Sequence, residues 1–393
     1  MNTTSRVYDV VLFGATGYAG GLVAEYLAHH APAQMRWALA GRNQTKLEGV
    51  RSALTAINPQ LAQLELIDAD TGKPDSMRRI AESARVVITT VGPYIQYGEP
   101  LVAACAAAGT DYVDLTGEPE FVDRMWLGYH EQAQRSGARI VHCCGFDSIP
   151  HDLGALFTVL QLPASVPVRI EGHVRAGGRF SAGTYHSAIH AFSRMRLHGQ
   201  VQRERRAREP LPEGRQIGSL EGGVHRDPAG GGWLVPAPTI DPQIVRRSAV
   251  ALDRYGPDFR YGHYFQLERF SHVAGLFAGV GALVALAQMG PTRRWLLGRL
   301  ESGEGPTPAQ RAKGWFKVRF IGEGGGRRVV TEVSGGDPGY AETAKMLSEA
   351  AMCLAFDELP KRCGQLTPAV AMGESLLHRL QKAGIRFEVV EKS

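Results

Sequence analysis

The sequence is poor in cysteine, and its few thiols are not spaced to bind a metal. Five of the 393 residues are cysteines, and no two have the two-residue separation that is typical of zinc ligands. Their odd number, together with a polar N-terminus unlike a secretory signal, indicates reduced thiols and a cytoplasmic protein. His142 and His151 are too isolated in the sequence to indicate a metal site, so no metal is predicted. The cysteines are Cys105, Cys143, Cys144, Cys353 and Cys363.

An excess of charge of one sign is also lacking. Forty-four Lys and Arg face 39 Asp and Glu, which leaves a net charge of +5 at pH 7. The basic residues concentrate only within Arg194–Arg215, where no aromatic side chains alternate with them, so no nucleic-acid partner is predicted. This run is either a solvated helix face or a surface for an anionic partner, such as a phosphate-bearing carrier or lipid head groups.

What the first 150 residues do contain is a regular alternation of apolar runs and helical segments. Tyr8–Phe13 is a continuous apolar run, as expected of a strand buried on both faces of a parallel sheet. The alternation predicts an α/β fold that begins with a Rossmann doubly wound parallel sheet. The predicted strands are Tyr8–Phe13, Trp37–Ala40, Leu64–Ile67, Val86–Thr90, Tyr112–Asp114 and Ala138–Cys143. The predicted helices are Leu22–His29, Thr45–Leu54, Met77–Ser83, Glu99–Ala108 and Phe121–Ser136.

The pattern changes after residue 150. Longer strands are predicted at Val168–Arg175, Trp315–Ile321 and Val329–Val333, the last two joined by a glycine-rich turn that indicates a hairpin. Thr184–Arg194 and Tyr340–Phe356 are predicted helices, whereas Gly199–Pro242 has no clear pattern. We therefore expect a second, α+β domain with a mixed or antiparallel sheet. The expected division is 1–150, 151–340 and 341–393, with the C-terminal helices packing back on the Rossmann domain.

One apolar segment stands apart within the second domain. Val273–Met289 is uncharged over 17 residues, and as a helix it would reach about 25 Å, short of a ~30 Å hydrocarbon core. Three interpretations stay open: a buried helix or helical pair, a helix at a membrane surface or in a homodimer interface, and a true membrane span. Peripheral membrane contact and a homodimer are thus alternatives beside a purely cytoplasmic monomer.

A glycine-rich loop follows the first predicted strand and precedes a helix. Gly14 and Gly17 would let the backbone turn tightly and approach the pyrophosphate of a dinucleotide, and Gly20 would allow the helix to pack closely against the strand. The residues predicted to contact the cofactor here are Gly14, Ala15, Thr16, Gly17, Tyr18 and Gly20.

The end of the second strand predicts which dinucleotide is bound. NAD-selective sheets place an acidic residue there, but this chain has Arg42, with Lys46 one turn later. A guanidinium can bind a 2′-phosphate in bidentate fashion, so NADP(H) is the predicted cofactor. Asp68, after the third strand, lies either at the adenine edge or in a helix cap. Val91, Gly92, Pro93 and Tyr94 end the fourth strand, on the predicted nicotinamide side.

Several motifs along the chain together point to one known family. They are Gly14–Gly20, Ala40–Arg42, Val91–Tyr94, Gly109–Glu118, Cys144–Pro150, Ser334–Tyr340 and Glu342–Met346. With these motifs the chain resembles the saccharopine dehydrogenase-like oxidoreductases, and within them most the branch with the trans-acting enoyl reductases of polyketide-lipid assembly. The resemblance implies a Rossmann domain followed by an α+β domain, with NADP(H) in the cleft, and it specifies the substrate poorly.

The main functional prediction is an NADPH-dependent reductase of an enoyl or keto group on an apolar, lipid- or polyketide-type acyl substrate, which a carrier protein could present. Such a reduction needs a proton donor, and the candidates are Tyr94, Tyr185 and Asp147. A helix N-cap and a packing tyrosine are competing interpretations for Asp147 and Tyr94. Two alternative functions stay open: a non-catalytic, lipid-surface-associated NADP-binding module, and a saccharopine-like amino- or imino-acid dehydrogenase.

Overall fold

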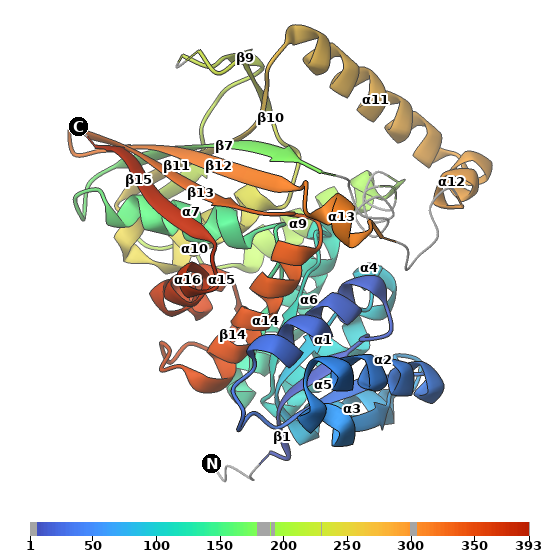
Figure 1. Cartoon of the computed structure of the whole chain (residues 1–393). Helices are drawn as coiled ribbons and strands as arrows, with labels where there is room; N and C mark the ends of the chain where they lie inside the picture. The colour runs from blue at the N-terminus through green and yellow to red at the C-terminus, as the bar shows by residue number, and fades with distance from the viewer. Residues whose placement is uncertain (1–5, 179–188, 190–192, 229, 299–304, 393) are drawn as a thin grey trace. The chain divides into compact units, whose positions relative to one another are not determined.

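The computed structural model describes residues 6–178, 189, 193–228, 230–298 and 305–392, which form two compact units. Among these residues, the first unit comprises 6–146, 305 and 340–379, and the second comprises 147–298, 306–339 and 380–392. The first unit is therefore built mainly from two long stretches, 6–146 and 340–379, that lie far apart in the sequence. Both units are shown in Figure 1.

The first unit contains a seven-stranded parallel sheet in the order β14-β6-β5-β4-β1-β2-β3. The strand order reverses beside β1, which is the arrangement of a Rossmann sheet. Its central strands are buried on both faces, which explains their uninterrupted apolar sequence. The strands are β1 (Tyr8–Phe13), β2 (Trp37–Gly41), β3 (Glu65–Asp68), β4 (Ala84–Thr89), β5 (Asp111–Asp114), β6 (Arg139–Val141) and β14 (Gly364–Leu366).

Helices from both ends of the chain cover this sheet. The helix α14 (Ala341–Phe356) contacts α1, β1, β4 and β5, and Figure 1 shows it in orange-red beside the blue α1. Tyr26 of α1 donates a hydrogen bond to Glu349 of α14 at 2.9 Å. The remaining helices of this unit are α1 (Tyr18–His30), α2 (Gln44–Ile57), η1 (Pro59–Gln63), α3 (Pro74–Ser83), α4 (Tyr94–Tyr97), α5 (Glu99–Ala108), α6 (Pro119–Ser136) and α15 (Pro368–Ala371).

The second unit contains a mixed eight-stranded sheet. Its order is β15-β13-β12-β7-β11-β10-β9, with β8 paired to β11. The pairs β7–β11 and β8–β11 are parallel, and the other pairs are antiparallel. The strands are β7 (Val168–Gly177), β8 (Gln216–Ser219), β9 (His225–Arg226), β10 (Trp233–Pro236), β11 (Asp258–Leu267), β12 (Trp315–Gly324), β13 (Arg327–Gly335) and β15 (Arg386–Lys392).

Two buried helices lie against this second sheet. The helix α7 (Ile149–Leu160) contacts β7, β12 and β13, and α10 (Asp241–Ala251) contacts α7, β8 and β11. These contacts bring the first turns of α7 and α10 close to β11. The other helices are α9 (Met195–Arg208), η2 (Asp253–Tyr255), α11 (Phe270–Gln288), α12 (Gly290–Leu297), α13 (Pro308–Arg311) and α16 (Gly373–Lys382), the last of which continues from the first unit into the second.

The expected α/β class, parallel Rossmann sheet and second mixed sheet are confirmed, and each predicted strand overlaps an observed one. Gly199–Pro242, whose sequence has no clear pattern, contains most of α9 and the short strands β8, β9 and β10. The strand β11 was not predicted. Thr184–Arg194 lies largely outside the described residues.

Candidate cofactor and active site

The glycine loop between β1 and α1 has a backbone that only glycine fits. Gly14 has φ +100°, its N–H donates to the Ala40 carbonyl at 3.0 Å, and its own carbonyl accepts from Thr90 Oγ1 at 3.1 Å. A Cβ on Gly20 would lie 2.1 Å from that same Gly14 carbonyl oxygen. The absence of side chains at these two positions therefore lets the loop and the first turn of α1 pack directly against each other.

The N-terminus of α1 is suited to an anion. Its N-cap is Gly17, which provides no side-chain cap, and the first turn contains no acidic residue. The first backbone N–H groups of a helix have no partner within the helix and carry partial positive charge. Ala15 is buried beneath the loop and Thr16 is exposed, while the Tyr18 ring packs edge-on against Tyr340 at 4.7 Å between centroids. The residues present fit a dinucleotide pyrophosphate.

Two exposed cations follow β2, at the position where the sequence predicts contact with the ribose 2′-phosphate. Arg42 and Lys46 are both exposed, and Asn43 between them caps α2 by accepting a hydrogen bond from the Lys46 N–H at 2.9 Å. No hydrogen bond or ion pair to Arg42 is seen within the described part of the chain. The cap fixes the backbone while both cationic side chains stay available. Asp68 lies beside Gly41 at the end of β3 and is exposed, whereas the helix-turn contacts are made by Asp70 instead.

The loop after β4 is stabilised by hydrogen bonds to a carboxylate. Glu118 accepts hydrogen bonds from the backbone N–H groups of Tyr94 and Ile95, at 3.0 and 2.9 Å. Tyr94 is buried, and its hydroxyl donates to the Thr89 carbonyl at 3.1 Å. Burial, with the nearby Asp114 carboxylate, raises the pKa of Tyr94 well above its usual value. The hydroxyl proton of Tyr94 is thus used in a hydrogen bond that stabilises the loop. Gly92 is exposed, and Val91 and Pro93 are half-buried.

Asp147 lies in the second unit, directly before α7. Its side chain is half-buried, and burial, followed by the charge of Asp241, raises its pKa to about 7. The neighbouring Ser148 is the N-cap residue of α7, but its side chain makes no capping hydrogen bond and instead lies 3.4 Å from Asp241 Oδ1. The N-cap position of α7 is therefore occupied by Ser148 and not by Asp147. Tyr185 lies outside the described residues.

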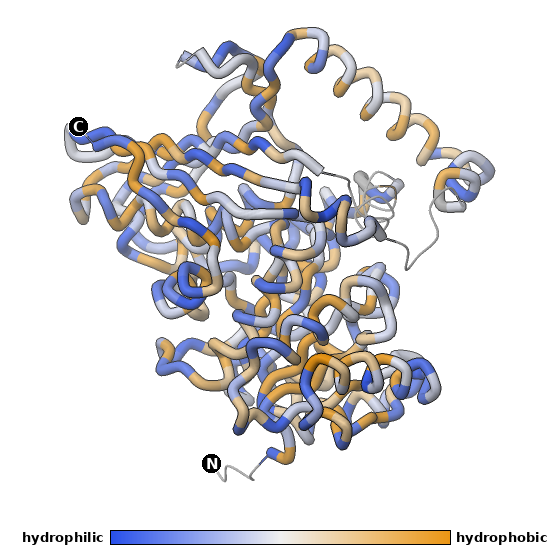
Figure 2. The backbone as a smooth tube through the Cα atoms, viewed as in Figure 1, coloured by the Kyte–Doolittle hydropathy of each residue, from blue (hydrophilic) through white to orange (hydrophobic). Residues whose placement is uncertain are grey.

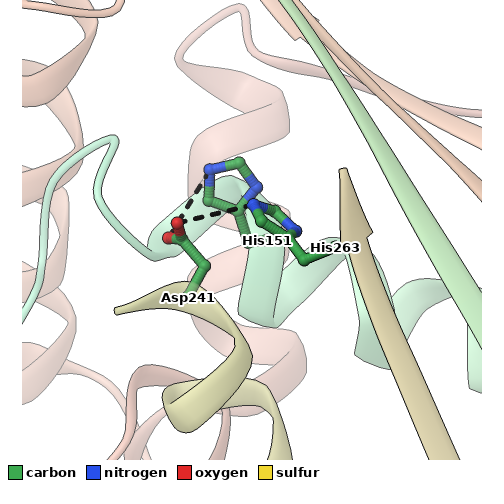
Figure 3. A group of neighbouring side chains, drawn as sticks. All are labelled: His151, Asp241 and His263. Atoms are coloured by element: carbon green, nitrogen blue, oxygen red, sulfur yellow. Dashed lines mark ion pairs between the residues drawn. The ribbon is translucent and has the colours of Figure 1, made fainter. Parts of the chain in front are cut away.

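Beside Asp147 the structure assembles a group that the sequence did not reveal. His151 in the first turn of α7, Asp241 at the start of α10 and His263 on β11 are all buried and point toward one another (Figure 3). Burial alone would raise the pKa of Asp241, but the two imidazoles hold it below its usual value. His151 was set aside as isolated because its partners come from distant parts of the chain.

The basic run on α9 is partly neutralised within its own unit. Arg205 and Arg247 both pair with Glu209, and Arg208 pairs with Glu204 at 2.7 Å. Arg203 and Arg206 stay exposed. Much of the run therefore has a structural function.

Comparison with known proteins places these features in a wider group. Residues 10–141 match the family model described as the saccharopine dehydrogenase NADP-binding domain. A Mycobacterium tuberculosis protein named as a trans-acting enoyl reductase is 38% identical, with 99% of each chain covered. A saccharopine dehydrogenase-like oxidoreductase of Arabidopsis thaliana, described as mitochondrial, is 30% identical over 100% of this chain and 99% of its own.

One solved structure supports the fold. The apo saccharopine dehydrogenase (L-Glu forming) of Saccharomyces cerevisiae aligns with a TM-score of 0.57 and 13% identity, covering 98% of this chain and all of that one. At that identity the match concerns the fold alone.

Proposed function

The chain belongs to the saccharopine dehydrogenase-like oxidoreductase family, in its trans-acting enoyl reductase branch, and from this membership we propose that it reduces an enoyl or keto group on an apolar acyl substrate. It is an NADP-dependent oxidoreductase with NADP(H) as its cofactor. The observation that carries the substrate proposal is the 38% identity over 99% of the chain to a protein named as a trans-acting enoyl reductase. The acyl chain would be of lipid or polyketide type and could be presented on a carrier protein.

When bound, NADPH supplies the hydride, while the protein binds and orients the cofactor and the substrate and protonates the substrate. Arg42 and Lys46 would hold the 2′-phosphate, and the backbone from Gly14 to Gly20 the pyrophosphate. Val91, Gly92 and Pro93 would contact the nicotinamide side, where the exposed Gly92 allows close approach. Asp68 would lie at the adenine side.

For the proton, the structural contacts favour Asp147 over Tyr94. Tyr94 donates its proton to a backbone carbonyl and has a strongly raised pKa, so its proton is poorly available. The pKa of about 7 at Asp147 keeps a large fraction of this carboxyl protonated near neutral pH, as general acid catalysis requires. Tyr185 stays a candidate on sequence grounds alone.

The test is turnover by the purified full-length chain. Oxidation of NADPH would be followed with medium- and long-chain enoyl and β-keto thioesters of pantetheine and of a carrier protein. Oxidation of amino acids, including saccharopine, with NADP⁺ would be followed in parallel. Product-forming NADPH oxidation on the thioesters supports the proposal. Turnover of the amino acids alone would replace it with the dehydrogenase alternative, and NADPH binding without turnover of either class would favour a non-catalytic module.

A second proposal concerns α11, which we infer lies on a lipid surface. This 19-residue helix has a mean hydropathy of 1.9, yet only 11% of it is buried, and Figure 2 shows it as a largely apolar segment. Within the described residues it is the single helix long and apolar enough to cross a membrane. Low burial argues against the interpretation as a core helix of the second unit.

Topology argues against a span. The strands before and after α11, β11 and β12, both pair with β7 in one sheet, so both ends of the helix must lie on the same side of a membrane. Among the described residues between α11 and β12, the longest helix is the eight-residue α12, which is too short to return across a membrane. A helix lying in the interface, with Arg269 before it and Arg293 and Arg294 after it, satisfies both constraints.

A further inference from the structure

The buried group of His151, Asp241 and His263 is the strongest unassigned chemistry in the described residues. Their candidate ligand atoms all lie within 4.8 Å of one another, and the three side chains come from three different elements of the second unit. Their exposed fractions are 2%, 3% and 6%, so water does not solvate the charge of the carboxylate. Groups of the protein interact with the charge instead: the two imidazoles, and hydrogen bonds from the side chains of Thr239 and Ser148.

The distances in this group differ from those of two other histidine–carboxylate pairs of the same chain. In the buried pair His142 Nδ1 lies 2.6 Å from Asp114, and in a partly buried pair His173 Nε2 lies 3.2 Å from Glu171; both are hydrogen-bond distances. In contrast, His151 Nε2 lies 3.6 Å from Asp241 Oδ1 and His263 Nε2 lies 3.5 Å from Asp241 Oδ2. The two imidazoles thus lie on either oxygen of the carboxylate, at distances longer than an ordinary hydrogen bond.

We propose that His151, Asp241 and His263 bind a divalent transition-metal ion of the zinc type. Ligand atoms at about 2.0–2.2 Å from a tetrahedral zinc ion are separated from one another by roughly 3.3–3.5 Å. The two imidazole nitrogens lie 3.6 and 3.5 Å from the two different oxygens of Asp241, and one candidate ligand atom from each residue falls within 4.8 Å of the others, so small side-chain shifts would bring them to that separation. Two imidazoles and one carboxylate favour zinc and its neighbours over magnesium or calcium, which prefer all-oxygen sites.

The surroundings supply the outer contacts that such a site needs. Tyr261 Oη lies 2.9 Å from His263 Nδ1, which fixes the ring so that Nε2 points into the group. Ser148 Oγ lies 3.4 Å from Asp241 Oδ1 and can orient the carboxylate.

The bound ion would act as a clamp within the second unit. It would join the first turn of α7, the start of α10 and β11, which otherwise meet at this point through polar side chains. Three protein ligands leave a fourth position for water. The zinc proposal does not rest on the proposed acyl-reductase function, although a cation bound to Asp241 would lower the pKa of Asp147, which the charge of Asp241 helps to raise. Its test does not use activity.

The experiment measures metal content on protein purified without an immobilised-metal column, from cells grown with added zinc. Inductively coupled plasma mass spectrometry should find about one zinc ion per chain. His151→Gln and Asp241→Asn should each lose the ion. His173→Gln, which removes a buried histidine of the adjacent strand from a pair at hydrogen-bond distance, should retain it. Chelation should lower the melting temperature of the wild type, and added zinc should restore it.

Two further measurements distinguish loss of the metal ligand from failure of a variant to fold. Tyr261→Phe should keep the stoichiometry but weaken zinc binding by about 10–100-fold. Titration of the chelated wild type with Co²⁺ should give visible absorption bands of a low-symmetry site, absent in His151→Gln. The proposal is overturned if the wild type holds no metal and binds neither ion saturably, or if His151→Gln binds as well as wild type. The group would then be a proton-bridged polar network.

Discussion

Among single residues, Arg42 is the one on which the choice between NADPH and NADH should depend. Its exposed guanidinium follows β2, where a 2′-phosphate would lie, and charge-assisted hydrogen bonds contribute about 1.5–3 kcal/mol. We expect Arg42→Ala to weaken NADPH binding by roughly 10–100-fold and to leave NADH binding unchanged. Intrinsic-fluorescence titration measures both affinities. Arg78→Ala, at an exposed arginine that pairs with Asp75, is the control; equal losses in both variants would assign the effect to general charge.

Gly20 and Gly21 give a matched pair for the phosphate loop. A Cβ on Gly20 would lie 2.1 Å from the Gly14 carbonyl oxygen, whereas a Cβ on Gly21 would meet its nearest atom at an ordinary 3.8 Å. Gly20→Ala should therefore displace the loop and abolish measurable NADPH binding. Gly21→Ala should bind normally and be as stable as wild type or slightly more so. Calorimetric titration and thermal melts report both. Normal binding by Gly20→Ala would show that the loop tolerates displacement.

Asp147 should determine the upper pH limit of activity. With a pKa of about 7, the carboxyl loses its proton as pH rises through neutrality. If the protonated form is the general acid, kcat/KM falls above pH 7, and Asp147→Asn removes this limb and lowers kcat by about 100-fold or more. Asp258→Asn, at a carboxylate that pairs with Arg260, should keep the wild-type profile. An unchanged profile in Asp147→Asn would assign the proton to another group.

At the scale of elements, α11 should be separable from the rest of the protein. Phe270 and Phe277 are 58% and 55% exposed, whereas Leu283 and Leu286 pack on a small cluster around Ala287 and Leu296. Replacing both phenylalanines with Asp should lower the affinity for anionic vesicles by roughly 100-fold, because each Phe buried in lipid contributes about 1.5–3 kcal/mol. Co-sedimentation with the vesicles measures this affinity.

The control for α11 is Leu211→Asp, at another strongly exposed apolar residue outside the helix. It should leave vesicle binding intact. If the double variant still sediments, the lipid-surface proposal fails. If the wild type never sediments but the double variant alters the sedimentation coefficient, α11 forms a contact between copies of the chain instead.

The elements also show how far the sequence could predict the fold. Strands such as Tyr8–Phe13 are buried on both faces, so their sequences are continuously apolar and can be predicted as strands. The strand β14 (Gly364–Leu366) has three residues and is specified by pairing with β6, not by its own composition. His151, Asp241 and His263 were missed for a related reason, since each lies in a different element and only tertiary packing brings them together.

At the scale of the whole molecule, the cofactor-binding unit is completed by the end of the chain. The helix α14 is buried along most of its length against α1, β1, β4 and β5. The strand β14 adds the last strand to the parallel sheet beside β6. A fragment ending at Phe146 would expose the apolar surface that α14 covers, and we expect it to be unfolded or aggregated.

The two stretches of this unit meet where the second unit is inserted, and this gives the last prediction. The Phe146 N–H donates to Thr343 Oγ1 at 3.0 Å, so a short Gly/Ser linker can join residue 146 to residue 340. The fusion of 1–146 with 340–379 should fold cooperatively and bind NADPH with an affinity near that of the full chain, because every predicted cofactor contact lies within it. Circular dichroism melts with and without NADPH compare it with 1–146 alone. Binding by 1–146 alone would make α14 and β14 dispensable, whereas a folded fusion that does not bind would mean that residues of the second unit complete the cofactor site.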